Sequence, residues 1–441
     1  MSAARRVRTF LAVAVLMGIV DSAGARLVAQ QFSDVDRQRS RDLIRLVRKD
    51  VERHYYDSTF HGIDISARFA AVEAQIAVAK SYSEVFSGIA RIFLDLGDSH
   101  TYFVPPERVT SVDYGFELQA FDDSCFVSFV REGSDASAKG VRPGDVVLSV
   151  NGLAPARDNL WKMRYVLQFI RPRSEIQLVL RSPGAEPRSL DVRASTQQRR
   201  VVDLTGTDGR IDISPRIREA EAAVRLDRSK YAELENDVLV WRLRSFHDYD
   251  NRIEDGIARA RKHKALILDL RANGGGEEDA LLELLGHFFD RDVQVGQRVG
   301  RSQSRRLTAK GRGASAFTGQ LIVVTDSETR SASEIFARAV QLTGRGRVIG
   351  DRTAGAVMRS RLFTHAQGSD RVILYGTRIS DADVVMSDGK RLERTGVLPD
   401  VERIPTSADL RAGRDPVLAD AAKLAGATLT PEAAGLLLRD R

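Results

Sequence analysis

The chain has 441 residues and a mass of 48.8 kDa, which predicts two or three domains because single cores rarely exceed about 250–300 residues. Hydrophobic residues at 43% and charged residues at 29% exclude a disordered or fibrous protein. One cysteine, Cys125, excludes an intrachain disulfide and a cysteine-based zinc site. The net charge of +7 comes from dispersed arginines without a basic, aromatic stripe, so a nucleic-acid partner is not expected.

The first 25 residues have the pattern of a secretory signal peptide. Arg5, Arg6 and Arg8 precede an apolar run over residues 10–20, and small residues at 23–25 supply a cleavage site. We therefore expect residues 1–25 to be removed and the protein to be exported to the periplasm or the medium. The alternative is an uncleaved N-terminal anchor. No later segment is apolar over the roughly 20 residues that a membrane span needs.

Residues 26–108 are predicted to form a small helical domain. Leu43, Ile44, Val47 and Val51 recur at helical spacing, and two further helices are expected over 67–79 and 83–94. A polar loop over residues 96–101 follows, and two consecutive prolines then break the chain.

Residues 110–196 are predicted to form a separate β-rich module. Strands are expected over 114–118, 125–130 and 175–181, with a helix around 158–169. The sequence GVRPGDVVLSVNG over 140–152 resembles a PDZ domain. That resemblance implies capture of a peptide C-terminus by strand addition, with the backbone N–H groups of Gly115 and Phe116 holding the carboxylate. The alternative is a scaffold that binds no peptide.

From residue 197 to 425, strands and helices alternate, which predicts an α/β core with a mainly parallel sheet. Active residues should then lie at the carboxyl ends of the strands. Residues 426–441 are expected to be a peripheral helix or tail. The core strands are expected over 238–243, 265–270 and 321–325, and the core helices over 252–261, 277–289, 333–341 and 416–424.

Three segments of this chain could carry chemistry. Ser331, with Glu334 three residues later, reads either as a helix cap or as a nucleophile at a helix start. Glycines 274–276 fit neither a dinucleotide-binding nor a Walker motif, which leaves a structural turn or a backbone anion site. His100 differs from the other six histidines because it lies in a polar loop at a domain junction. No His-x-x-x-His pair exists, so a zinc hydrolase is not expected.

Three motifs follow the PDZ-like module in a fixed order: DLRANGGG over 269–276, SASE over 331–334 and ERTGVLPD over 393–400. Their order resembles the C-terminal processing peptidases, also called tail-specific proteases, over about residues 36–425. The resemblance implies a crotonase-like α/β serine peptidase core, within a multidomain α/β chain, and no cofactor. The loop that carries a lysine base in the Ser–Lys branch of this family has Ala356 at that place.

The chain instead carries Ser99 and His100, which is similar to the branch of the tricorn protease core. Carried over by resemblance, Ser331 is the nucleophile and His100 its base, while Ser99 and Glu393 orient the imidazole. The oxyanion hole would comprise the N–H groups of Ala332 and of Gly275 or Gly276. Because Ser99 and His100 are adjacent, only an irregular loop would let both side chains join one hydrogen-bond chain.

We therefore expect an exported serine endopeptidase that acts on peptides or proteins, selected by their C-termini, and that is able to form oligomers. The rival interpretation is a catalytically inactive peptide-binding protein of the same fold, motivated by the missing lysine. The presence of all four tetrad residues argues against it. A reactive-serine probe would separate the two.

Overall fold

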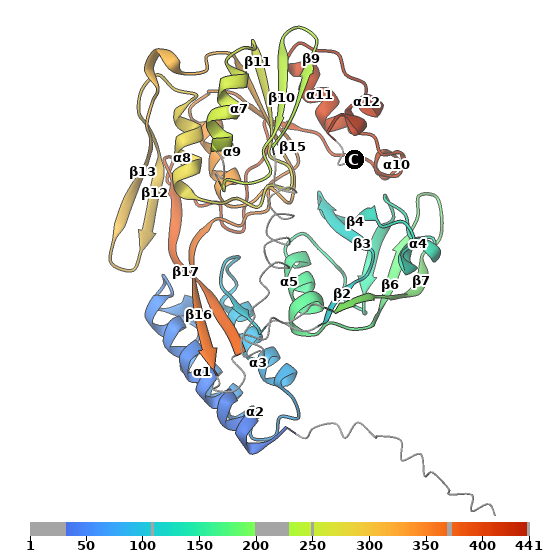
Figure 1. Ribbon diagram of the computed structural model, residues 1–441, viewed down its shortest axis with the longest axis vertical. Coiled ribbons are helices and arrows are strands. Elements are labelled where there is room, and N and C mark those ends of the chain that lie inside the picture. Colours follow the sequence, from blue (N-terminus) through green and yellow to red (C-terminus); the bar gives the residue numbers. More distant parts are fainter. Residues whose placement is uncertain (1–31, 107–109, 199–228, 248–250, 368–372, 439–441) are drawn as a thin grey trace, which may run out of the picture.

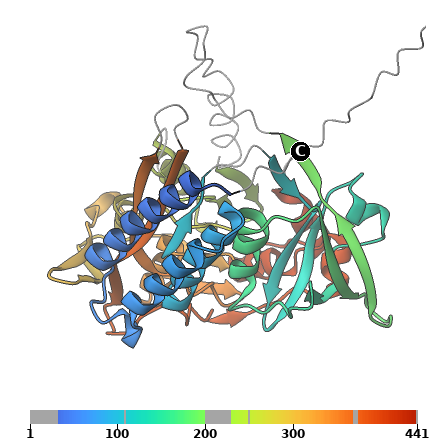
Figure 2. The ribbon, with the colours of Figure 1, turned by 90° about the horizontal axis from the view of Figure 1, so that it is seen from below.

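The computed structural model describes residues 32–106, 110–198, 229–247, 251–367 and 373–438. The predicted signal peptide, residues 1–25, lies outside these ranges. Figures 1 and 2 show a helical N-terminal domain and a β-rich domain side by side beneath a larger α/β core. No helix among the described residues is both long and apolar enough to cross a membrane.

Three capped helices form the N-terminal domain, as the sequence predicts. The hydroxyls of Ser33 and Ser81 and the carboxylate of Asp64 cap their first turns. The helices are α1 (Asp34–His54), α2 (Ile65–Ile76) and α3 (Tyr82–Leu96), with a short 3-10 turn, η1 (Phe60–Gly62), between the first two. Their apolar faces pack together, and they also pack on Tyr375 and Ile379 from the core's chain segment.

This last contact comes from a sheet that the sequence analysis did not predict. A long hairpin reaches down from the core onto α1, and the first strand after α3 joins it (Figure 1). The helical domain is therefore bound to the core through shared β-structure. The strands are β1 (Tyr102–Val104), β12 (Val293–Gly300), β13 (Ser304–Ala309), β16 (Met358–Gln367) and β17 (Ile373–Met386), in the order β1-β17-β12-β13 with β16 paired to β17.

The β-rich module is a five-stranded sheet with one long helix, and the predicted strand over 175–181 is confirmed. The first strand begins two residues later than predicted, at Phe116, because Gly115 adopts a positive φ of 75°. A small pair, β2 (Thr110–Asp113) with β8 (Ser195–Gln198), closes the module. The sheet comprises β3 (Phe116–Phe121), β4 (Ser124–Val130), β5 (Val146–Val150), β6 (Glu175–Arg181) and β7 (Arg188–Arg193); its helices are α4 (Asp135–Ala138) and α5 (Leu160–Tyr165), which continues as η2 (Val166–Ile170).

The core is a six-stranded sheet between two helical layers, and it is parallel except at one edge (Figure 1). The predicted mainly parallel α/β core is therefore confirmed. The strand order is β18 (Val401–Glu402), β15 (Arg347–Gly350), β14 (Gln320–Thr325), β11 (Ala265–Asp269), β10 (Val238–Arg242) and β9 (Lys230–Leu234), with β9 antiparallel.

Alternate side chains of these strands enter two separate apolar clusters. On β10, Leu239 and Trp241 face one cluster while Val238 and Val240 face the other. The first cluster is covered by α7 (Arg252–Ala260), α8 (Glu278–Gly286) and α9 (Ala332–Leu342), and the second by α11 (Pro416–Leu424) and α12 (Pro431–Leu437). Two short helices, η4 (Gly313–Ser315) and α10 (Ser407–Ala412), connect these elements. Residues 427–438 thus form part of the core's cover.

The β-rich module is held on the core by polar contacts. Arg157 donates to a carboxylate oxygen of Asp351 at 2.6 Å, and both side chains are largely buried. Gln119 on β3 donates to Asp326 at 2.8 Å, directly after β14. The module therefore meets the core at the carboxyl ends of the core strands, where the parallel sheet predicts the active residues.

Candidate active site

The loop between α3 and β1 carries His100 and is fixed by Asp98. Helix α3 ends at Gly97, which has the left-handed φ of 70°. One carboxylate oxygen of the buried Asp98 accepts the His100 N–H at 3.0 Å and the Ser380 hydroxyl at 2.8 Å. This side-chain turn makes the loop irregular, as the sequence analysis required for adjacent residues to act together.

Ser99 joins His100 to Glu393 in a chain of hydrogen bonds. The Ser99 hydroxyl lies 2.7 Å from His100 Nδ1 and donates to Glu393 Oε2 at 2.9 Å. The carboxylate of Glu393 also accepts the N–H groups of Ser99 at 2.8 Å and of Val357 at 2.7 Å. Since an ionised carboxylate only accepts, the Ser99 proton points to Glu393, and Ser99 Oγ accepts from His100 Nδ1–H. His100 Nε2 is then the unprotonated ring nitrogen.

Ser331 lies in the turn between β14 and α9 with a strained backbone. Its φ of 57° and ψ of −119° fall outside the regions that a serine normally adopts. Its N–H donates to Ala356 O at 2.9 Å and to Glu334 Oε2 at 3.0 Å. Helix α9 begins at the next residue, so backbone N–H groups surround the position of the hydroxyl.

The carboxylate of Glu334 holds the Ser331 turn in place through hydrogen bonds. Its fully buried carboxylate accepts the Thr353 hydroxyl at 2.5 Å and the N–H groups of Gly355 at 2.7 Å and Ala356 at 2.9 Å, in addition to that of Ser331. Burial raises the pKa of Glu334, although all these donors favour the ionised form. Glu334 therefore ties loop 353–356 to the Ser331 turn. The sequence analysis treated it only as a helix-capping residue, and the S-x-x-E spacing was the available signal.

A cavity of about 1170 Å³ opens over this region, between the helical domain, the β-rich module and the core. Its wall includes Ser99, His100 and Glu393 from the hydrogen-bonded chain, and Gly274 and Ala356 from the turns beside Ser331. In the described part of the chain, no hydrogen bond joins Ser331 to His100, whereas the other three tetrad residues are directly linked. A hydrogen bond of this kind commonly tightens only when substrate is bound.

Burial shifts the pKa values of the two titratable residues in this hydrogen-bonded chain, His100 and Glu393, in opposite directions. Burial lowers the pKa of His100 to about 4, and the nearby charges of Arg378 and Arg330 add to this effect while Asp98 opposes it. Burial also raises the pKa of Glu393 to about 7, against the effect of its three donors. The imidazole is consequently neutral, and so able to accept a proton, near neutral pH.

The glycine turn after β11 packs against Ser331. Gly275 has φ of 94°, and a Cβ there would lie 2.7 Å from the Ser331 Cβ, so no side chain fits. The Gly275 N–H already donates to Asn273 Oδ1 at 2.9 Å. Of the two glycines predicted for an oxyanion hole, Gly275 is therefore engaged elsewhere in this arrangement. The neighbouring Gly274 instead lies on the cavity wall.

The predicted peptide-binding loop of the β-rich module is also partly occupied. The N–H of Gly115 donates to Asp113 Oδ1 at 2.8 Å. Strand β3 lies at the end of its sheet, and two of its carbonyls are taken: Leu118 O accepts from Arg164 on α5, and Ala120 O accepts from Ser327 of the core. A peptide that adds to β3 would have to displace these contacts.

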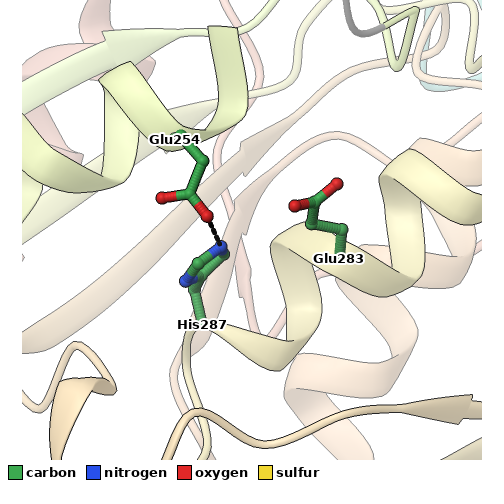
Figure 3. A group of neighbouring side chains, drawn as sticks. All are labelled: Glu254, Glu283 and His287. Atoms are coloured by element: carbon green, nitrogen blue, oxygen red, sulfur yellow. Dashed lines mark ion pairs between the residues drawn. The ribbon is translucent and has the colours of Figure 1, made fainter. Parts of the chain in front are cut away.

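One group of side chains away from the cavity has the composition of a metal site: Glu254, Glu283 and His287 (Figure 3). The ring of His287 is buried between Arg261, which lies 3.1 Å from Nδ1, and Glu254, 3.2 Å from Nε2. Because arginine only donates, Nδ1 must accept and Nε2 carries the proton. The Nδ1 lone pair is then taken by Arg261, while Nε2 meets Glu254 as an ion pair without hydrogen-bond geometry, so neither ring nitrogen offers a lone pair to a metal in this arrangement.

Comparison with known proteins relates two segments of the chain to known domain families. The model of peptidase family S41 matches residues 237–403, and the PDZ domain model matches residues 107–181. The chain thus carries a PDZ domain followed by a peptidase S41 domain. It is 25% identical over 373 residues to the chloroplastic C-terminal processing peptidase of Tetradesmus obliquus, a match that covers 80% of this chain and 75% of the relative. The predicted PDZ module and processing-peptidase resemblance are thus confirmed.

Other relatives are longer than this chain. The tail-specific protease of Haemophilus influenzae is 24% identical over 321 residues, which cover 69% of this chain but only 43% of that protein. The structure of mature CPAF complexed with lactacystin superposes with a TM-score of 0.63 at 15% identity, covering 88% of this chain and 98% of that one. This last likeness shows that the fold is shared from the helical domain through the core.

Proposed function

We propose that this S41 chain is a serine endopeptidase whose nucleophile is Ser331 and whose general base is His100. The observation that supports the proposal most strongly is the chain from His100 Nδ1 through Ser99 to Glu393, beside a large cavity. That chain holds His100 in the tautomer with a free Nε2, which a general base needs. A side chain at position 356 is not required as a base, so the alanine there is compatible with catalysis.

In the proposed reaction, His100 Nε2 takes the Ser331 proton while Oγ attacks the substrate carbonyl carbon. The imidazolium that forms keeps its Nδ1–H on Ser99, and the charge of Glu393 stabilises it through that hydroxyl. His100 then gives its proton to the leaving amine, and an acyl group remains on Ser331. Water, deprotonated by the same nitrogen, hydrolyses this ester and restores the serine.

The oxyanion of each tetrahedral intermediate needs two or more N–H donors. We propose the N–H of Ala332, the first residue of α9, with one donor from the 274–276 turn. Since Gly275 donates to Asn273, Gly274 or Gly276 supplies that donor unless the turn rearranges when substrate binds. The positive end of α9 adds a favourable field at the same place.

Substrate selection by the PDZ domain and export of the protein are further parts of the proposal. A free C-terminus would meet the start of β3 at Gly115 and Phe116, where the PDZ fold binds carboxylates. Export rests on the signal-peptide pattern of residues 1–25. N-terminal sequencing of protein recovered from outside the cytoplasm should then begin at Arg26, and an intact Met1 on that protein would contradict cleavage.

The test of the catalytic proposal is labelling by a fluorophosphonate, which reacts with activated serines. Wild-type protein should be labelled and should cleave an unfolded protein substrate, while Ser331→Ala should do neither, with a loss of several orders of magnitude in kcat. Ser333→Ala is the control, because this buried hydroxyl makes only a 3.3 Å hydrogen bond to Asn273 O. An unlabelled wild-type protein that still binds peptides would favour the inactive rival.

A further inference from the structure

A second cavity of about 490 Å³ adjoins the catalytic one. The two share wall residues: Ser99, Tyr102, Trp161, Arg330 and Arg378 line both. Arg330, the residue before Ser331, lines both cavities, so a side pocket begins next to the proposed nucleophile. Ser99 is the one tetrad residue on its wall, and the proposed mechanism gives the rest of the pocket no role.

One wall of the pocket is the sheet that joins the helical domain to the core. Arg378 on β17 lies directly opposite Tyr102 on β1 and Leu362 on β16. Residues that face each other across antiparallel strands project from the same side of the sheet. The next residue on that side of β17 is Gly376, which has no side chain. Across this wall, Arg378 therefore lies between the side chains of Tyr102 on one neighbouring strand and Leu362 on the other.

The opposite wall is the PDZ helix. Helix α5 and its continuation η2 present Trp161, Tyr165 and Phe169, four residues apart, to the pocket. The Tyr165 hydroxyl donates to Phe103 O at 2.6 Å, which fixes the helix against β1. The other side of the same helix packs into the PDZ core through Leu160, Met163 and Leu167. The helix is therefore apolar on two sides, and the second side has no role within the PDZ fold itself.

The charges of the pocket are positive. Arg164 and Arg330 both pair with Glu328, at 3.0 and 2.6 Å. Arg378 makes one hydrogen bond, to Ser360 Oγ at 3.2 Å, and has no carboxylate within ion-pair distance among the residues that the structure describes. Among the described residues, none of those lining this pocket is acidic. The carboxylate of a bound ligand could therefore pair with Arg378 without competing with a carboxylate among the described residues.

We propose that this pocket is a specificity site that binds one large apolar or aromatic side chain of the substrate, with a substrate carboxylate beside Arg378. The inference rests on the proposed peptidase function and names its substrate class. Aromatic walls on both sides favour a flat or branched side chain over a small one. The carboxylate belongs either to an acidic side chain or to the free C-terminus of the substrate. In either case, the PDZ domain contributes to selection through the outer face of α5.

The experiment measures kcat/KM for internally quenched peptides in which one residue is changed in turn to Ala, Leu or Phe at each position around the cleaved bond. One position should favour Phe or Leu over Ala by roughly ten- to a hundredfold. At that position, Leu362→Ser should reduce the preference at least threefold, mainly through KM. Leu374→Ser is the matched control, because Leu374 lies on the same side of the same hairpin and is 54% exposed, against 49% for Leu362.

The carboxylate is tested separately with Arg378→Gln. Peptides with Asp or Asn near the preferred position, and with a free or amidated C-terminus, identify which carboxylate the wild-type enzyme prefers, and the variant should lose that preference. Arg361→Gln, on the neighbouring strand but outside the pocket, should keep it. If Ser331 is labelled by fluorophosphonate but Ala, Leu and Phe give equal rates at every position, the specificity pocket is refuted while the proposed peptidase function stands. Absence of labelling would overturn the proposed function instead.

Discussion

Replacing Glu393 by glutamine tests the relay through Ser99 most directly. The carboxylate accepts three hydrogen bonds: Oε1 from the Ser99 N–H, and Oε2 from the Val357 N–H and the Ser99 hydroxyl. A glutamine has one NH₂ in place of an oxygen, so in either orientation it opposes one backbone N–H donor. Leaving a buried donor without an acceptor costs about 1–3 kcal/mol of stability.

The same substitution acts on the tautomer of His100. When the NH₂ stands at the Oε2 position it donates to Ser99, whose proton then turns to His100 Nδ1. Nε2 becomes the protonated nitrogen and no longer accepts the Ser331 proton. A wrong tautomer in a serine protease costs about 10⁴ in kcat, and we expect a loss of about 10³–10⁴ here.

The pH profile separates this mechanism from general damage. Burial raises the pKa of Glu393 to about 7, so the ionised relay is lost as the pH falls below that value, before His100 with its pKa of about 4 takes up a proton. The two groups are linked through Ser99, so the profile reports apparent values of the pair. Wild-type kcat/KM should rise with an apparent pKa near 7, and Glu393→Gln should lack that limb. A variant with the wild-type rate, or with the limb intact, would refute the relay.

Three further changes test other parts of the structure. Because the folded chain keeps His100 neutral down to about pH 4 while the unfolded chain binds a proton from about pH 6.5, the contribution of His100 to stability is lost as pH falls through this window, whereas that of Glu393 changes in the opposite direction. His100→Gln should therefore raise the melting temperature at pH 5 relative to that at pH 7, compared with the wild type. Asp269→Asn removes the charged partner of Arg242 and one of the two carboxylates that pair with Arg271, and should cost about 3–5 kcal/mol by urea denaturation, whereas Asp292→Asn at an exposed pair should have a much smaller effect; equal effects would contradict the importance of the buried network. Amidating a substrate's C-terminus should raise KM with little change in kcat if Gly115 and Phe116 bind the carboxylate, and an unchanged KM would reduce the PDZ domain to a scaffold at that loop.

The sequence by itself determined the elements that depend on local patterns. The helical spacing of Leu43 to Val51 predicted the first helix, and the apolar runs over 265–270 and 321–325 predicted the central parallel strands, each to within one residue at its ends. Motif order gave the family, and the match of residues 237–403 to peptidase family S41 agrees with it. These features are local because periodicity and turn chemistry act over a few residues.

Only the tertiary structure decided how distant residues meet. The contact of Ser99 with Glu393 spans 294 positions, and it exists because Asp98 bends its loop against Ser380 on the long hairpin. That hairpin has no strong alternation, since its strands are partly buried on both sides by different domains. The engagement of Gly275 by Asn273, and of the β3 edge by the core, likewise depends on packing between elements that no single window of sequence contains.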